Sequence, residues 1–356
     1  MDIQEFDYFL PKNLISQKPI TPRDGCKLFV YDRKTNKTEH IIFKEITKFF
    51  NKGDTLVLND TKVFPARMYG TKKTKGKIEV FLLNPIDNIF DPEKISNKWY
   101  VLLNKKFNLN EEIVFLKNNK VFLKGKVISQ DDKIIFEFNK KGIELIKRIY
   151  LLGNMPIPPY IKNTNKKDLE KYQNVYAKNL GSCAAPTAGF HFTNTLLQKL
   201  KKQGVNVVYI TLHVGLGTFK PIKTDKVENH KMDKEYYVVS KYTADILNKT
   251  RQNKNKIFAV GTTVVRTLES AYSNGFKEAS GFTDIYIYPG YQFKAIDCFI
   301  TNFHLPKSTP LMMLAGFINN QVQNKQKSKD ILLSLYKEAI KKEYLFYSFG
   351  EAMLII

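Results

Sequence analysis

Glu111-Glu-Ile-Val-Phe-Leu-Lys-Asn-Asn-Lys-Val-Phe-Leu-Lys-Gly-Lys-Val-Ile128 contains two β-rich runs, one on each side of Asn118-Asn119. Asparagine tolerates the positive φ angles of a tight hairpin turn, so the segment predicts two antiparallel strands. Similar β-rich runs lie nearby, at Lys77 to Leu83, Lys98 to Leu103 and Lys133 to Phe138. Asp131-Asp132 is a further candidate turn. No helical periodicity interrupts them. Short strands at roughly 8 to 12 residue spacing are typical of a small antiparallel barrel or sandwich.

The rest of the chain predicts strands that alternate with helices. Strands are expected at Lys27 to Tyr31, Thr55 to Leu58, Val205 to Val214, Ile257 to Val260, Thr283 to Tyr288, Lys294 to Ile300 and Tyr344 to Ser348. Helices are expected after Thr193 or Thr195, near Thr243, after Gly261, from Ser308 or Thr309 with Pro310, from about Ser328 to Lys342, and partly within Asn163 to Lys178.

A helix-like segment, Gly142 to Leu152, follows the β-rich region, and the stiff Pro156-Ile-Pro-Pro-Tyr160 leads back to the alternating pattern. The sequence therefore predicts an α/β fold of two parts. The large mixed-sheet α/β domain is discontinuous and comprises residues 1–66 and 153–356. A small antiparallel β-barrel domain, residues 67–152, is inserted into it.

Composition limits the class of protein. The chain has 356 residues, 43% of them hydrophobic, which is enough for substantial cores. It has no basic patch followed by an apolar run at its start and no stretch long enough for a membrane span, so we expect a cytoplasmic protein. Cys26, Cys183 and Cys298 lie far apart and predict neither a disulfide framework nor a zinc site.

The formal net charge of +23 favours a polyanionic partner such as nucleic acid. Lysine dominates this charge, so a compositional bias toward a lysine-coated surface explains it as well. Only six of the 57 basic residues are arginine, and such scarce residues are candidates for specific roles: Arg23, Arg33, Arg67, Arg148, Arg251 and Arg266.

The loop Ala184-Ala-Pro-Thr-Ala-Gly-Phe-His-Phe192 has the composition of a ligand site. It combines Pro186, the hydroxyl of Thr187, the flexible Gly189 and the titratable His191, and a helix is expected to begin directly after it. Free N–H groups at such a helix start bind anionic ligands, and histidine exchanges protons near neutral pH. A turn whose histidine bonds only to backbone accounts for the same residues.

Other polar residues follow predicted strands. Asn59, Asp60, Thr61 and Arg67 come after the strand at Thr55, where open α/β sheets place ligand contacts, although an Asx turn is the alternative. Two further loops carry glycines, hydroxyls or a guanidinium that could bind phosphate or carboxylate: Gly215, Gly217 and Thr218 in one, and Thr262, Thr263 and Arg266 in the other. Arg266 and Glu269, three positions apart, could instead form a surface pair.

Four of the five histidines fall within 114 residues: His191, His213, His230 and His304. Their spacing lacks the HxxxH or HxH patterns of metal sites, so proton transfer is favoured over metal binding. A serine hydrolase is not expected, because no G-x-S-x-G motif is present.

Six motifs in order give the chain a resemblance from Phe6 to its last strand. It resembles the S-adenosylmethionine:tRNA ribosyltransferase-isomerase family of queuosine biosynthesis. The motifs are Gly53 to Arg67, Ala184 to Phe192, Thr211 to Phe219, Gly261 to Ser270, Tyr288 to Tyr291 and Ile300 to Pro306. The chain departs from the family pattern at Lys27, Asp233, Leu345 and Glu351, where Arg, His, Arg and Asp are expected.

The resemblance implies an α/β domain with an inserted barrel. It also implies transfer and isomerisation of the ribosyl moiety of S-adenosylmethionine onto 7-aminomethyl-7-deazaguanine at the tRNA wobble position. Epoxyqueuosine would form, with release of adenine and methionine. S-adenosylmethionine is then a co-substrate, no further cofactor or metal is expected, tRNA is the macromolecular partner, and we expect a monomer.

Such chemistry needs proton transfers at a C–H beside the sulfonium, at adenine and at the substrate amine. Our hypothesis is that His191, His213 and His304 share these transfers in one pocket at the strand ends. Substrate binding is expected from the motif residues, namely Asn59, Asp60, Thr61, Arg67, Pro186, Thr187, Gly189, Gly215, Gly217, Thr218, Thr262, Thr263, Arg266, Tyr288, Tyr291 and Asn302.

Two alternatives remain open from the sequence. An RNA methyltransferase would release S-adenosylhomocysteine instead of adenine. A non-catalytic RNA-binding protein would use the barrel as an RNA platform and release neither.

Overall fold

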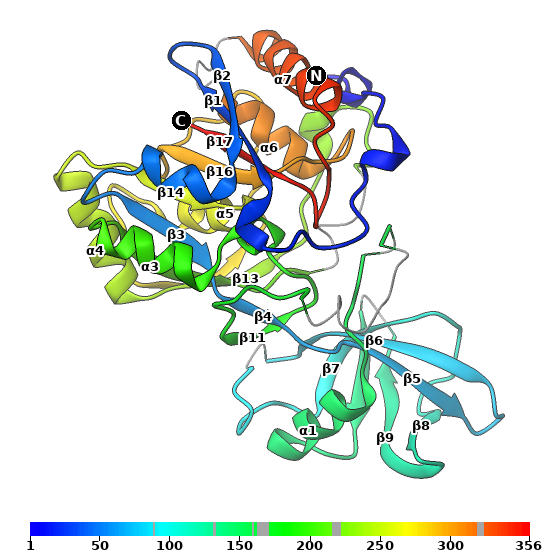
Figure 1. The fold of residues 1–356 in the computed structure, drawn as a ribbon. Coiled ribbons are helices and arrows are strands. Elements are labelled where there is room, and N and C mark those ends of the chain that lie inside the picture. The colour runs from blue at the N-terminus through cyan, green and yellow to red at the C-terminus, as the bar shows by residue number, and fades with distance from the viewer. Residues whose placement is uncertain (88–89, 131–132, 159, 162–170, 216–221, 319–323) are drawn as a thin grey trace.

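The computed structural model describes residues 1–87, 90–130, 133–158, 160–161, 171–215, 222–318 and 324–356. Figure 1 shows two parts, a larger one built around a twisted sheet and a smaller barrel below it. The mixed α/β fold with an antiparallel barrel agrees with the expectation from the sequence. Among the described residues, no helix combines the length and the apolar character that a membrane crossing needs.

The large sheet has nine strands in the order β15-β13-β12-β3-β14-β16-β17-β1-β2. Strands β12, β3, β14 and β16 are mutually parallel, with Val57 opposite both Val208 and Ala259. The strands are β1 (Lys27–Asp32), β2 (Lys37–Ile42), β3 (Thr55–Asn59), β12 (Asn206–Leu212), β13 (Glu235–Val239), β14 (Ile257–Val260), β15 (Ala279–Thr283), β16 (Cys298–Asn302) and β17 (Ala352–Ile355).

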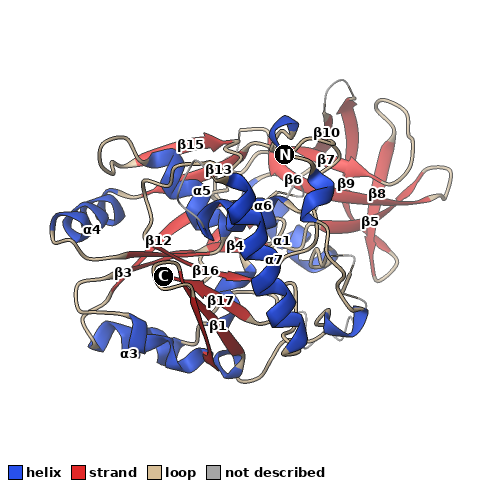
Figure 2. Ribbon diagram, turned by 90° about the horizontal axis from the view of Figure 1, so that it is seen from above, coloured by secondary structure: helices blue, strands red, loops and turns tan. Residues whose placement is uncertain are grey.

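Helices cover both faces of this sheet (Figure 2). The core on one face contains side chains of α4 (Lys241–Gln252), α5 (Thr262–Ala271), α6 (Thr309–Ile318) and α7 (Lys325–Lys341). The core on the other face contains α3 (Asn194–Lys202). Thr193 caps α3 by accepting from the Leu196 N–H, as its place before the apolar run predicts. Because both faces are covered, the central strands are buried along their length, which explains their continuous apolar sequences.

The barrel closes in the order β10-β7-β6-β5-β8-β9, and every neighbouring pair is antiparallel. Its strands are β5 (Arg67–Lys72), β6 (Lys77–Pro85), β7 (Lys98–Leu103), β8 (Glu112–Lys117), β9 (Lys120–Ser129) and β10 (Ile134–Phe138). The turn between β8 and β9 places Asn118 and Asn119 at φ angles of 51° and 60°, as predicted. The candidate turn at Asp131-Asp132 lies outside the described residues. Helix α1 (Gly142–Leu152) contributes Leu145 and Ile149 to the barrel core.

The chain enters and leaves the barrel side by side. The Arg67 N–H donates to the Asn154 carbonyl at 3.1 Å, and the Asn154 N–H donates to the Arg67 carbonyl at 2.8 Å. Next to this connection, on the side of the α/β domain, β4 (Thr61–Val63) pairs in parallel with β11 (Asn179–Ser182). The polypeptide therefore enters and leaves the barrel at one place, and Cys183 adds a contact beside it by packing in the barrel core.

Two predicted strands are wrong. Residues 284–288 are not in a strand, because the Thr283 hydroxyl accepts the Ile285 N–H and bonds Ser270, which ends β15 at Thr283. Residues 344–348 are not a strand either. Tyr347 has a φ of 74°, and the Gly350 N–H closes a turn onto its carbonyl, so the last strand begins only at Ala352. In the segment predicted as partly helical, the described residues 171–178 form turns.

Candidate active site

Four parallel strands place polar residues at one edge of the sheet. β3 ends at Asn59, β12 at Leu212 just before His213, β14 just before Gly261-Thr262, and β16 at Asn302. Carboxyl ends of parallel strands meet at the same edge, which is where open α/β sheets bind ligands. Motifs as distant in the sequence as those of Asn59 and Asn302 are thereby brought together.

A cavity of about 340 Å³ opens at this edge. Predicted site residues from three motifs line it: Pro186, Thr187, Thr262, Thr263, Asn302 and His304. Its remaining lining is largely apolar, including Ala184, Ala185, Ala188 and Val214. A mostly apolar cavity with a few convergent polar groups is the usual form of a small-molecule site.

Two helices begin at the cavity. α5 starts at Thr262 after Gly261, and α6 starts at Thr309 after Ser308, and residues of both starts line the cavity. The first N–H groups of a helix lack partners within the helix, and the helix dipole adds partial positive charge there. This part of the cavity therefore favours a carboxylate or another anionic group.

His304 is the predicted catalytic histidine that lines the cavity. Its Nε2 lies 2.9 Å from the hydroxyl of Thr301, and within the described residues its Nδ1 has no hydrogen-bond partner. Its backbone is fixed by Tyr336, whose hydroxyl accepts the His304 N–H at 3.0 Å, and by the Tyr8 hydroxyl, which donates to the His304 carbonyl. Burial lowers the pKa of His304 to about 3, so the ring is neutral at neutral pH and Nδ1 is the atom available to a ligand.

His191 lies behind the cavity wall. Its ring is buried against Phe43, with Nε2 at 3.3 Å from Asn302 Oδ1 and Nδ1 at 3.2 Å from the sulfur of Cys26. Burial lowers its pKa to about 4. Asn302, which lines the cavity, contacts this ring, so Asn302 connects His191 to a ligand in the cavity.

His213 faces away from the cavity. Its Nδ1 lies 2.8 Å from the Thr61 hydroxyl, and its ring packs against Phe90. Side chains of successive extended residues point to opposite sides, and the next residue, Val214, is the one that lines the cavity. Burial lowers the pKa of His213 to about 4. Of the three imidazoles expected in one pocket, the structure places His304 in the cavity lining and His191 and His213 outside it.

Asn59 and Asp60 join strands instead of facing the cavity. Asn59 donates to the Leu212 carbonyl at 3.0 Å and to the Thr263 hydroxyl at 3.1 Å, while its oxygen accepts from the Thr61 and Leu212 N–H groups. Asp60 accepts from Thr211 at 2.7 Å and from Asn179. Asn59 thereby fixes Thr263, a lining residue, relative to β12.

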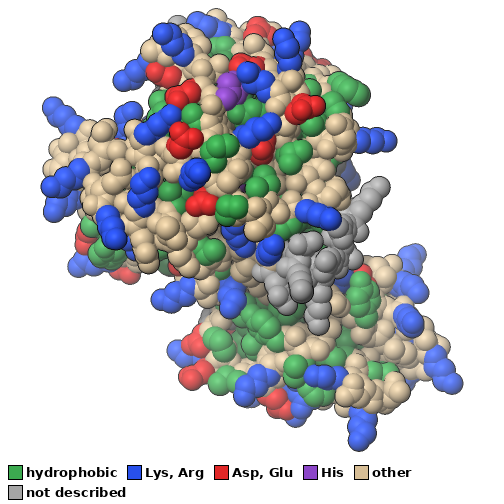
Figure 3. Space-filling view, in the orientation of Figure 1, with side chains coloured by type: hydrophobic (Ala, Val, Ile, Leu, Met, Phe, Trp, Pro, Cys, Tyr) green, Lys and Arg blue, Asp and Glu red, His purple; other side chains and the backbone are tan. Residues whose placement is uncertain are grey.

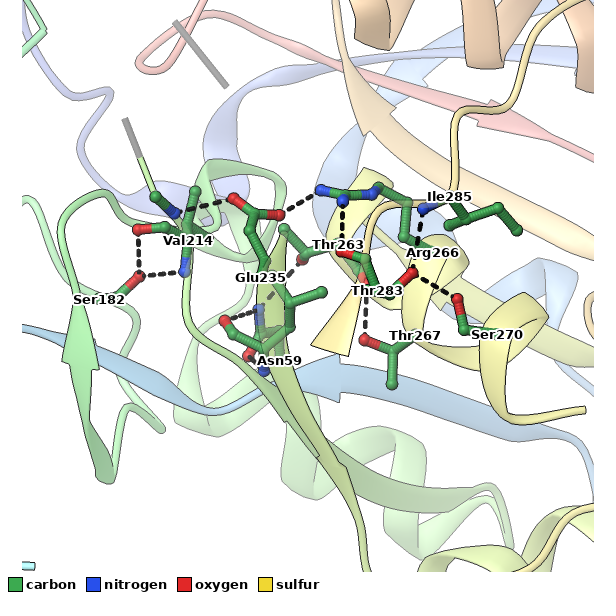
Figure 4. A network of polar contacts seen from close by, with 12 residues as sticks. Asn59, Ser182, Val214, Glu235, Thr263, Arg266, Thr267, Ser270, Thr283 and Ile285 are labelled. Atoms are coloured by element: carbon green, nitrogen blue, oxygen red, sulfur yellow. Dashed lines mark hydrogen bonds and ion pairs between the residues drawn. The ribbon is translucent and has the colours of Figure 1, made fainter. Parts of the chain in front are cut away.

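Arg266 is buried and already paired. Its guanidinium bonds Glu235 and donates to the Thr283 carbonyl at 3.2 Å, and the second oxygen of Glu235 accepts the Gly215 N–H at 2.8 Å (Figure 4). Both side chains are only 4% exposed. The alternative of a surface pair with Glu269 does not hold, because Glu269 is buried and accepts the N–H groups of Lys294 and Ala295. The ion pair between Arg266 and Glu235 therefore connects α5, which begins at the cavity, to the loop after β12.

Several other predicted binding residues lie away from the cavity lining. Arg67 lies on the barrel, 3.5 Å from Glu79. Tyr291 donates to Glu269, and the ring of Tyr288 packs against Tyr286. Gly189 packs closely, since a side chain there would meet the Tyr176 hydroxyl at 2.0 Å. Gly217 and Thr218 lie outside the described residues.

Sequence reasoning did not identify three further residues at the cavity. Tyr160, Tyr347 and Ser348 line it, and the hydroxyls of Tyr160 and Ser348 are hydrogen-bonded. Tyr347 and Ser348 belong to the segment wrongly predicted as a strand, and Tyr160 to the proline-rich connection. No motif or periodicity marks them, so only the fold identifies them.

Similarity to known proteins covers the whole chain. A family model described as queuosine biosynthesis protein matches residues 3–355. The chain belongs to this family. It is 46% identical over 360 residues to the S-adenosylmethionine:tRNA ribosyltransferase-isomerase of Sulfurihydrogenibium sp. (strain YO3AOP1), with 100% of both chains covered. It is also 46% identical over 362 residues to the protein of that name from Staphylococcus aureus (strain Newman), again with 100% of both covered.

A crystal structure in the same family supports the fold. The S-adenosylmethionine tRNA ribosyltransferase of Thermotoga maritima is 35% identical to the chain and superposes with a TM-score of 0.55. The match covers 99% of this chain and 100% of that one. The curated relatives of this queuosine biosynthesis protein are thus named as transferases and isomerases, which is the class of enzyme that the sequence resemblance implied.

Three of the four positions at which the sequence resemblance leads us to expect another residue lie together in the structure. The carboxylate of Glu351 accepts the backbone N–H groups of Lys27 at 3.3 Å and Leu345 at 3.1 Å. The Lys27 ammonium bonds the carbonyl of Lys342 at 3.0 Å and lies over the Tyr344 ring. These substitutions therefore form one contiguous structural contact. Asp233, the fourth departure, acts on the pKa of His230, which burial lowers and the Asp233 charge raises.

Proposed function

We propose that this protein transfers and isomerises the ribosyl moiety of S-adenosylmethionine onto 7-aminomethyl-7-deazaguanine at the wobble position of tRNA. Adenine and methionine leave and epoxyqueuosine remains. The observation that carries the proposal is the full-length match to relatives named for this reaction class, together with a cavity built from the matching motifs.

The cavity suits the small substrate in two respects. Its apolar walls accommodate adenine and the methionine side chain, and the starts of α5 and α6 offer N–H groups for the methionine carboxylate. Since Glu235 already neutralises Arg266, we assign the carboxylate to these helix starts and to Thr262 and Thr263 instead. S-adenosylmethionine supplies its own activating positive charge at sulfur.

His304 is the candidate for proton transfer at the substrate. A neutral imidazole with Nδ1 open to the cavity can accept a proton from the carbon beside the sulfonium or from the incoming amine. General acid–base groups contribute roughly 10² to 10⁴ in rate. We expect His304→Ala to lower kcat by that order with S-adenosylmethionine still bound.

The test is product analysis with tRNA that carries the modified base and labelled S-adenosylmethionine. Equimolar adenine and methionine support the proposal. S-adenosylhomocysteine would indicate a methyltransferase, and tRNA binding without either product would indicate a binding protein. His40→Ala is a matched control, because His40 lies on β2 and bonds Glu338 and Tyr344 away from the cavity lining.

The tRNA is expected to bind through lysine. Lys and Arg side chains are spread over both parts of the face seen in Figure 3, and the chain carries a formal charge of +23. Binding that neutralises phosphates releases counterions, so tRNA affinity should fall steeply between 50 and 200 mM salt, by about 10³-fold for roughly six contacts. A flat response would show that the basic surface does not hold the RNA backbone.

A further inference from the structure

The orientation of the Asn302 amide is determined by its neighbours. Asn302 is buried at the end of β16 and lines the cavity. Its Nδ2 lies 2.8 Å from the Tyr347 carbonyl and 3.4 Å from the Ser348 carbonyl. Carbonyl oxygens only accept hydrogen bonds, so the amide nitrogen must face them. Its oxygen, Oδ1, therefore faces His191.

This orientation determines which nitrogen of His191 carries hydrogen. Asn302 Oδ1 can only accept, so His191 Nε2, 3.3 Å away, must be the protonated nitrogen. In a neutral ring Nδ1 is then an acceptor, and the nearest polar group to it is the Cys26 sulfur at 3.2 Å. The thiol must be the donor. Burial raises the pKa of Cys26 and lowers that of His191, so both groups are in the neutral forms that this pattern requires.

We propose that Cys26 and His191 are positioning residues that hold the Asn302 amide oxygen ready for the substrate. The hydrogen-bond chain runs from the Cys26 S–H to His191 Nδ1 and from His191 Nε2–H to Asn302 Oδ1. A carbonyl oxygen has two lone pairs, and the second one accepts an O–H or N–H donor in the cavity. The ligand group is therefore a hydroxyl or amine, such as a ribose hydroxyl or the adenine amino group. This inference rests on the proposed function for the identity of that ligand.

Removing the thiol leaves a buried acceptor without a partner. In Cys26→Ala, His191 Nδ1 loses its donor in the core, and the ring is free to turn away from Asn302. A lost hydrogen bond of this kind corresponds to about a tenfold change. We expect kcat/KM for S-adenosylmethionine to fall about tenfold in Cys26→Ala. Cys26→Ser keeps a donor at the same place and should remain within about threefold of the wild type.

Cys298→Ala is the matched control. Cys26 and Cys298 are both buried in the same core on the α3 face of the sheet, so each alanine removes one sulfur from similar packing. If both alanine variants lose kcat/KM equally, the effect is general destabilisation and the proposal is wrong. Failure of Cys26→Ser to recover activity also contradicts it.

A measurement without turnover tests the hydrogen-bond chain itself. In protein labelled with ¹⁵N-histidine, His191 should show a protonated Nε2 and a bare Nδ1 at neutral pH, and Cys26→Ala should change these shifts. His191→Gln identifies the signals. A bare Nε2 in the wild type would overturn the inference. If the spectrum is as expected and no adenine is released, the proposed function fails while the hydrogen-bond chain stands.

Discussion

The barrel and the α/β domain differ in what they bury. Among the described residues, all 25 buried polar or charged side chains lie outside residues 67–152, so the described barrel interior is lined by apolar side chains. Trp99, Phe115, Phe136 and Leu123 are among its core residues. In the α/β domain, by contrast, buried polar groups concentrate where the parallel strands end, and they bond one another in pairs and chains.

The difference indicates which interactions stabilise each of the two parts. An apolar interior is stabilised by packing and tolerates changes of surface residues. A buried polar group is costly unless it is bonded, so each one in the α/β domain depends on a specific partner. Substitutions should therefore damage the barrel through lost volume and the α/β domain through lost partners.

The largest effect is expected from Arg266→Ala. It leaves the carboxylate of Glu235 buried without its cationic partner, which should lower the free energy of unfolding by about 3 to 5 kcal/mol in urea denaturation. Glu235→Gln combined with Arg266→Met removes both charges and should recover part of the loss. If Arg266→Ala instead leaves stability unchanged and raises the KM for S-adenosylmethionine, Arg266 binds the substrate directly.

In the barrel, Leu123→Ala should cost about 3 kcal/mol through the cavity it leaves. Adenine release by the folded protein should not change, because no buried polar contact is lost. Leu102→Ala, at a side chain 47% exposed on β7, should stay within about 0.5 kcal/mol of the wild type in the same denaturation experiment. A loss of catalysis in Leu123→Ala would show that barrel packing supports the cavity.

Acid should destabilise the α/β domain first, since residues 67–152 contain no histidine. The pKa of buried His191 is lowered to about 4, so the unfolded chain binds the proton more readily than the folded one. The contribution of neutral His191 to the free energy of unfolding is complete above pH 6.5 and is lost as the pH falls toward 4. Between pH 7 and 5 the free energy of unfolding should fall by about 2 kcal/mol from this residue. His191→Gln should reduce that slope, and an unchanged slope would contradict the assignment.

A small effect is expected at an exposed ion pair. Lys48 and Glu39 lie 2.5 Å apart, but their side chains are 43% and 50% exposed. Solvent screens such pairs, so Lys48→Ala should change the free energy of unfolding by less than about 1 kcal/mol. If Lys48→Ala lowers the free energy of unfolding nearly as much as Arg266→Ala, burial does not determine how much an ion pair stabilises this protein.

Local sequence predicted the fold where local interactions determine it. The strand at residues 98–103 and the helix at 142–152 were predicted to the residue, since turn residues and periodicity bound them. The strand predicted at 344–348 failed because Tyr347 takes a positive φ in a turn that wraps the sheet edge. No local pattern indicates that turn.

The sequence predicted which motifs form the site but not which of their side chains face the cavity. The strand ends meet as expected, yet alternation of side chains turns His213 away, and Asn302 separates His191 from the cavity. Scarcity of arginine was also misleading as a guide to ligands. Arg33 donates to the carbonyls of Phe317 and Asp297, and Arg23 to those of Lys171 and Gln173. At both positions one guanidinium joins segments distant in sequence, which lysine cannot do with the same geometry.

The reciprocal hydrogen bonds between Arg67 and Asn154 place the two ends of the insert next to each other. The same geometry makes the barrel exchangeable. A short turn joining residues 66 and 153 would close the remaining chain, and barrels from relatives could be grafted at the same junction.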